Sequence, residues 1–505
     1  MRASSDLYDL VKCLSPSEKR YFKLNAGNPS QGNKYMWIFE IAEKHTVEEE
    51  AEIVAQIKDP KTKRQFPVMK AYLHKQLLKS LRNFHSERST DIELRELLTN
   101  AEILIGKKLY LQCQKQLDKA EKLALRFEKF DFLLQVAYFR MSLIMQYSQG
   151  SLERLQTTLG KIFFDLDKYL QLYQNLLSYK ELSLQMLVQN RREQQIATPT
   201  GREAYDKLFA NPLIADPVNA VSNRARLFCC QSRLIFFLAD GDFGSSFDAS
   251  AEIVSLMETM PELLDERPEN YINSLQNLIT VSTLAKPAET SLGLIAHLKK
   301  YRENIPSIKF EAALQPKVDF FAINLELQIL LEDGRIEEAA HRLEEVREVL
   351  GFFEEGLNFN EGFVTVSLHF KVARLALSRR EHRIALEHLN YILNDSGIDQ
   401  GYDVFANAKM LQVMVYFDAG ESELLESALL ALYRVLQKRK SLKRFDKELI
   451  KALRKLVDLP KGKNLQPWFR DLLAELRAIV EGDQDSPTQS QKDIFYWLDA
   501  KLKDS

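Results

Sequence analysis

Amide side chains in this sequence are spaced so that they could line a binding surface. Asn273 and Asn277 stand four residues apart, and so do Asn324 and Gln328. On a helix, this spacing places both members of a pair on one face. Because a primary amide both donates and accepts hydrogen bonds, such pairs can bind the backbone of an extended peptide. The alternative is that all four are ordinary exposed polar residues.

A first cluster of basic residues occupies positions 58–82, where Asp59 is the only acidic residue. Lys75, Lys79 and Arg82 within it are spaced four and three residues apart, as on one face of a helix. The apolar residues of the same stretch fall on the opposite face, and they are Leu73, Leu77, Leu81 and Phe84. The cluster therefore predicts a basic amphipathic helix.

Segment 1–90 as a whole predicts short helices, over about 5–13, 16–26, 33–44, 47–57 and 67–85. The last two, joined by a basic connector, would form a variant of the helix-turn-helix. Its lysines and arginines would then bind DNA or RNA by neutralising phosphates. The alternative is a solvated helix face that packs by its apolar side.

A second basic cluster lies near the C-terminal end, and its densest part is Lys438, Arg439, Lys440, Lys443 and Arg444. It could bind an acidic partner or a nucleic acid, although most charge runs are solvated faces. Between the two clusters, 326–361 is rich in Glu and also contains Arg335, Arg342 and Arg347. That mixture predicts ion pairs on helix surfaces.

No combination of residues predicts catalysis. The sequence has no glycine-rich phosphate loop, no dinucleotide-binding motif and no HExxH zinc motif. His382 and His388 lie six residues apart, which does not place them on one helical face. Cys229 and Cys230 are adjacent and have no nearby His, so we expect them in the core. We therefore expect no enzyme, cofactor or metal, with an enzyme of unrecognised type as a third alternative.

The composition predicts a helical protein of the cytoplasm. The 505 residues are 45% hydrophobic and 28% charged, which suffices for a large core. Only 18 Gly and 15 Pro residues are present, whereas a β-rich protein of this length needs many more for its turns. A net charge of -2 implies no general attraction to nucleic acid or membrane. No stretch has the length and apolar character of a signal peptide or a transmembrane helix.

A sequence pattern recurs along the chain. Gly334 follows an apolar helix, and Ile336, Ala339, Leu343 and Val346 then share one face of the next helix. The glycine permits a tight turn, and the small Ala339 lets two helices approach closely. The residues at this close-packing position are Cys113, Leu155, Ser246, Ser291, Ala339, Ala385 and Leu425. Most neighbours in that series are 40 to 48 residues apart, and the gap of 91 predicts a hidden repeat near residue 200.

This pattern resembles the turn and second helix of tetratricopeptide repeats. The resemblance covers roughly 100–435 and is closest at 334–346, 241–253 and 420–432. The period departs from that family, whose repeats are about 34 residues long. HEAT-like repeats have the longer period but lack the glycine turn, and they remain the alternative. The resemblance implies a right-handed superhelical solenoid in which the first helix of each hairpin lines a concave groove.

The predicted fold is therefore all-α, with a small N-terminal helical domain or cap over 1–90, tetratricopeptide-like repeats over 91–435 and basic C-terminal helices over 436–505. Leu14–Lys23 is also similar to the opening of large bacterial helical-repeat proteins, which implies no function. The predicted function is a non-enzymatic scaffold that binds a protein or peptide and no membrane. The alternative is a nucleic-acid-linked regulator whose N-terminal segment binds DNA or RNA and whose repeats sense a partner.

Overall fold

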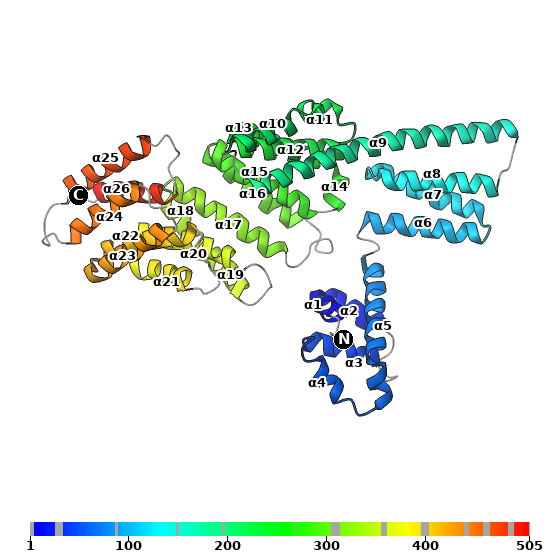
Figure 1. Cartoon of the computed structure of the whole chain (residues 1–505), viewed down its shortest axis with the longest axis horizontal. Coiled ribbons are helices and arrows are strands. Elements are labelled where there is room, and N and C mark those ends of the chain that lie inside the picture. The colour runs from blue at the N-terminus through cyan, green and yellow to red at the C-terminus, as the bar shows by residue number, and fades with distance from the viewer. Residues whose placement is uncertain are drawn as a thin grey trace. The chain divides into compact units, whose positions relative to one another are not determined.

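The fold is all-α, as the composition predicts. The computed structural model describes residues 5–25, 34–85, 89–147, 151–193, 196, 198–266, 268–304, 314–354, 361–394, 403–438, 444–457, 465–482 and 489–503. Within these ranges every regular element is a helix and no strand occurs. The chain divides into two compact units, Met1–Pro268 and Glu269–Ser505, which we describe separately (Figure 1). None of the described helices combines the length and the apolar character needed to span a lipid bilayer.

The first helices of the chain share a hydrophobic cluster of their own. They are α1 (Asp6–Cys13), α2 (Pro16–Asn25), α3 (Lys34–Lys44), α4 (Glu50–Ala55) and α5 (Pro60–His85). Val11, Phe39 and Leu73 are among the fully buried residues of this cluster. A capping box starts α2, because the backbone N–H of Glu18 donates to Ser15 Oγ and that of Ser15 donates to the Glu18 carboxylate.

Helix α5 begins seven residues earlier than the sequence pattern predicts. The expected basic connector before residue 67 is helical, because Pro60 suits a first turn and the Asp59 carboxylate accepts from the backbone N–H groups of Lys61 and Thr62, at 3.1 and 3.2 Å. Buried Phe66 extends the apolar stripe through this region. The predicted bounds of the connector are therefore wrong: residues 56–59 join the six-residue α4 to α5, which runs unbroken through Pro67.

The remaining helices of the first unit pack mainly on their neighbours in sequence. They are α6 (Thr90–Gly106), α7 (Tyr110–Arg126), α8 (Phe130–Gln146), α9 (Leu152–Arg192), α10 (Pro199–Phe209), α11 (Pro212–Ala215), α12 (Asn223–Asp240), α13 (Phe243–Glu258) and α14 (Pro261–Glu266), with the 3-10 turn η1 (Pro217–Asn219). Helix α9 is 41 residues long. Its Tyr169 belongs to a cluster with α6–α8, whereas Met186 packs in a cluster with α10 and α12. The stretch near residue 200, where the sequence predicts a hidden repeat, comprises the second half of α9 and α10.

The second unit consists of α15 (Pro268–Ala285), α16 (Ala288–Asn304), α17 (Leu314–Glu332), α18 (Ile336–His341), α19 (Leu343–Glu354), α20 (Glu361–Ser378), α21 (His382–Asn394), α22 (Asp403–Ala419), α23 (Ser422–Lys438), α24 (Arg444–Val457), α25 (Gln466–Gly482) and α26 (Gln489–Lys503). Consecutive helices α20 to α26 pack in turn against one another, and α22 also contacts α20 and α26. One large hydrophobic cluster runs from Val366 to Leu498.

Glycine turns join several helices where the repeated pattern predicts them. Gly241, Gly334 and Gly420 have positive φ angles of 79°, 71° and 72°, a conformation that glycine adopts without strain. The small residues at the close-packing positions are fully buried, and they are Cys113, Ser246, Ser291, Ala339 and Ala385. Leu155 is only partly buried. The copy of the pattern that contains it is not followed by an interhelical turn, because α9 continues as one helix.

Candidate protein-binding face

The predicted basic face of the first unit is exposed. Lys75, Lys79 and Arg82 all lie on the solvent side of α5. Lys70 of the same cluster is instead buried, with its Nζ 2.7 Å from a Glu50 carboxylate oxygen. Because one cation of the cluster is neutralised inside the fold, the exposed basic surface is smaller than the sequence predicts.

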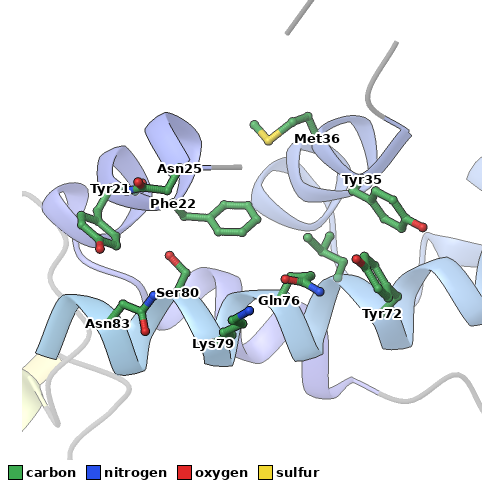
Figure 2. Close-up of a pocket in the computed structure, with 11 residues that line it drawn as sticks. Tyr21, Phe22, Asn25, Tyr35, Met36, Tyr72, Gln76, Lys79, Ser80 and Asn83 are labelled. Carbon is green, nitrogen blue, oxygen red and sulfur yellow. The ribbon is translucent and has the colours of Figure 1, made fainter. Parts of the chain in front are cut away.

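Lys79 borders a hollow of about 400 Å³ between α2, α3 and α5. Figure 2 shows its side chain beside Gln76 and Ser80 on α5, across from the aromatic residues of α2 and α3. The aromatic lining includes Tyr21 and the closely packed pair Tyr35 and Tyr72, whose ring centroids are 4.7 Å apart. The hollow is therefore lined by aromatic side chains together with one cation and several amides.

The second basic cluster can be placed only in part. Arg444 opens α24 and is exposed, and Lys438 is the last residue of α23. Arg439, Lys440 and Lys443 lie outside the described residues.

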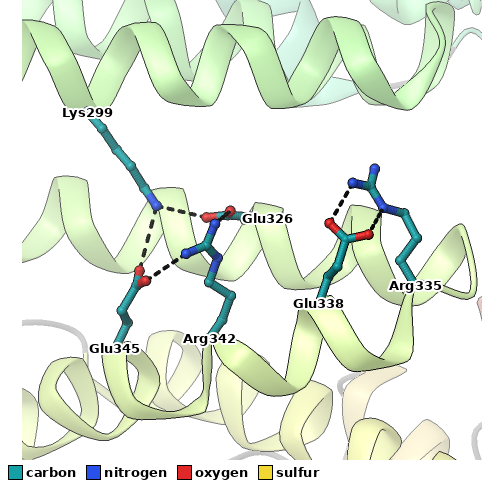
Figure 3. Close-up of polar contacts among 6 residues, drawn as sticks. All are labelled: Lys299, Glu326, Arg335, Glu338, Arg342 and Glu345. Carbon is teal, nitrogen blue, oxygen red and sulfur yellow. Dashed lines mark hydrogen bonds and ion pairs between the residues drawn. The ribbon is translucent and has the colours of Figure 1, made fainter.

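The acidic segment of the second unit forms the helix-surface ion pairs that the sequence predicts. Buried Glu326 of α17 contacts Lys299 of α16 and Arg342, each at 2.8 Å (Figure 3). Glu345 contacts the same two cations, at 3.7 and 3.0 Å. Since every charged group in this cluster has an opposite partner, the cluster ties α16, α17 and α19 together and is suited to packing rather than catalysis.

The other side of α17 carries the amides predicted to line a groove. Asn324 Oδ1 accepts hydrogen bonds from Lys371 Nζ at 2.7 Å and from Ser367 Oγ at 3.1 Å, both from α20. Gln328 Nε2 donates to Glu332 Oε1 at 3.1 Å. Both amides are thus brought to one surface, but each already has a partner within the protein.

We call this surface the polar face. It comprises Asn324, Gln328 and Glu332 of α17, Ser367, Lys371 and Arg374 of α20, and Asp418 of α22. Asn273 and Asn277 are exposed on α15, a helix that contributes none of these residues.

Lys371 is the most unusual residue of the polar face, because it is buried beside neutral partners. Burial, together with repulsion from Arg374, lowers the pKa of its amine from 10.5 to about 7, while attraction to Glu332 opposes the shift. A large fraction of this lysine is therefore uncharged near neutral pH. Sequence reasoning missed it because its partner Asn324 lies 47 residues away.

The C-terminal helix α26 is seated on the polar face. Asp493 of α26 forms an ion pair with Arg374 at 2.6 Å, and both side chains are only 8% exposed. Asp418, which is 5% exposed, accepts a hydrogen bond from Trp497 Nε1 at 3.0 Å and pairs with Lys501 at 2.8 Å. A helix is thus held on this surface by charges that have been removed from water.

A histidine pair on α20 and α21 is a second feature that the sequence does not reveal. The Nδ1 atoms of His369 and His388 lie 2.7 Å apart, and the His369 ring stacks on Tyr391 with centroids 4.0 Å apart. Burial lowers the pKa of His369 to about 4 and also lowers that of His388. Two neutral rings can share one proton, with one donating and the other accepting. Among the described residues, no three potential metal ligands come together.

No protein-family model matches this chain, and no curated protein matches its sequence.

Proposed function

We propose that this chain is a non-enzymatic helical-repeat scaffold that binds a segment of a partner protein on the polar face. In this proposal the hairpins form a right-handed tetratricopeptide-like solenoid, and α17, α20 and α22 line its concave side. The observation that carries the proposal is the seating of α26, because a helix is bound to this surface through the buried pair of Arg374 and Asp493.

The side chains of the polar face suit recognition of a protein segment. Asn324 and Gln328 offer hydrogen-bonding groups at helical spacing, and Arg374 offers a buried guanidinium. A guanidinium presents a planar fork of donors, which matches a carboxylate in direction as well as in charge. The face is therefore selective for acidic and polar side chains.

Photocrosslinking in a native lysate tests this proposal. A benzoylphenylalanine replaces Gln328 on the polar face in one chain, and Asn273 on exposed α15 in the control chain. We expect irradiation to give a discrete protein adduct from position 328 that survives nuclease treatment and is absent from position 273. Identical adducts at both positions, or none at 328, would contradict the proposal.

Nucleic-acid binding by the first unit is the second candidate, and the exposed row of Lys75, Lys79 and Arg82 favours it. Nearby tyrosines could stack on unpaired bases, while the cations neutralise phosphates. In this case the N-terminal helices bind nucleic acid and the repeats sense a partner.

Charge reversal distinguishes this candidate. Changing Lys75, Lys79 and Arg82 together to Glu should abolish binding to a short duplex or single strand at moderate salt. The matched control reverses Lys115, Lys119 and Lys122, which are exposed on α7 at the same spacing of four and three. Equal loss in both variants would indicate a nonspecific charge effect, and no binding by the unaltered chain would rule the candidate out.

A further inference from the structure

Three contacts of α26 form a regular row. Asp493, Trp497 and Lys501 are spaced four residues apart, so they lie along one face of the helix. Asp493 contacts Arg374 of α20, and the other two contact Asp418 of α22. The polar face therefore matches an acid, an indole and a cation, in that order along a helix.

The contacts of this row contribute more to the selectivity of the polar face than to the stability of the fold. Removing an ion pair from water costs about as much as the pair regains by attraction, so apolar residues of similar size often stabilise a site as well or better. Leaving one charge buried without its partner is, by contrast, strongly unfavourable. With α26 in place, Arg374 and Asp418 are both nearly inaccessible to solvent, so a helix without the complementary groups would leave these charges buried and unpaired.

The remaining contacts of α26 combine buried apolar side chains with exposed polar ones. Ile494 and Leu498 are buried in the large hydrophobic cluster of the second unit. Tyr496 is 47% exposed, although its hydroxyl donates to the Glu332 carbonyl at 2.7 Å. Asp499 pairs with Arg477 of α25 at an exposed position. An amphipathic helix from another protein could make the same set of contacts.

We propose that the polar face recognises amphipathic helices with an acidic residue, a tryptophan four residues later and a lysine four residues after that. Helix α26 is the resident occupant, and a partner helix of this pattern replaces it. This inference rests on the proposed function and specifies the partner of the same site. The inference rests on charge complementarity, because Arg374 and Asp418 of the face are both matched by residues in one row of the helix.

The test uses the full chain and a fluorescent peptide that copies residues 489–503. The labelled peptide should bind the unaltered chain weakly, because α26 competes for the face. The substitution Asp493→Asn in the chain weakens the contact of α26, which competes with the peptide for the face. Peptide affinity should therefore rise about ten-fold, as expected for loss of a charged hydrogen bond. A peptide with Trp497→Ala should lose about ten-fold in affinity for either chain.

The control variant is Asp499→Asn, which removes the same charge from α26 at the exposed contact with Arg477. Its peptide affinity should stay within about two-fold of the unaltered chain, because exposed ion pairs contribute little. If Asp493→Asn reduces the helical circular-dichroism signal, Lys501→Gln replaces it as the weakening change.

Two outcomes would overturn the inference: the peptide binds none of the folded chains, or the weakened chain binds it no more tightly than Asp499→Asn. In either case α26 is a permanent cap. Crosslinking from position 328 tests the proposed function independently of the peptide. A partner adduct without peptide exchange would support the proposed function and indicate that the face recognises another pattern. Exchange without any adduct supports the recognition pattern and contradicts a protein partner in that lysate.

Discussion

At the scale of single residues, Lys371 links burial to stability. Its folded-state pKa of about 7 lies below the ordinary value of 10.5. Between these values the unfolded chain binds a proton that the folded chain lacks, so raising the pH favours folding. The gain is at most about 1.4 kcal/mol per pH unit. The thermal midpoint of the unaltered chain should therefore rise relative to that of Lys371→Met as the pH increases from about 7 to 9.

Exposed Lys75→Met is the control for this comparison, since it removes a lysine without removing a buried amine. Its midpoint should differ from that of the unaltered chain by the same amount at each pH. A difference between Lys371→Met and the unaltered chain that stays constant with pH would show that Lys371 is charged throughout.

Residue spacing in the sequence places individual side chains well but does not predict their partners. Asn324 and Gln328 do share one face, as their spacing of four predicts. The groups that Asn324 binds come from α20, more than forty residues further along the chain. Asp493 is farther still from Arg374. Such pairs depend on how helices stack, and no local pattern encodes that stacking.

At the scale of elements, two glycines of the second unit predict opposite effects of the same substitution. Gly420 ends α22 with a φ of 72°, where an added Cβ meets no atom within 4 Å. Gly420→Ala should therefore cost about 1 kcal/mol through backbone strain alone. Gly293 lies inside α16, also with open space around it, so Gly293→Ala should stabilise by about 0.5–1 kcal/mol. Thermal melting measures both, and equal signs would contradict the turn geometry.

Helix boundaries could be predicted where turn chemistry and apolar periodicity agree. The positive φ angles at Gly241, Gly334 and Gly420 follow the repeated pattern. Prediction failed at α5, where Pro67 suggests a boundary but the apolar stripe continues through buried Phe66. The sequence also did not predict that α9 belongs to two hydrophobic clusters, because one long helix lacks the turn that marks a repeat.

At the scale of the whole molecule, each of the two units contains hydrophobic clusters of its own. The clusters around α1–α5, around α6–α9 and around α9–α12 belong to the first unit. Those around α17–α20 and α20–α26 belong to the second. Because burial of apolar surface provides most of the free energy of folding, each unit contains a source of its own stability.

Residues 268–505 should therefore fold without the rest of the chain. We expect this fragment to be helical and to melt cooperatively at one of the midpoints shown by the full chain. Trp497, which is 6% exposed, should keep the emission of a buried indole.

A second fragment ending at residue 488 lacks the buried side chains of Ile494, Trp497 and Leu498. Each such side chain stabilises by about 1.5–3 kcal/mol, so the shorter fragment should melt well below the longer one. A longer fragment without a cooperative transition would show that the second unit depends on the first, and equal midpoints would show that α26 adds no stability to the unit on which it is seated.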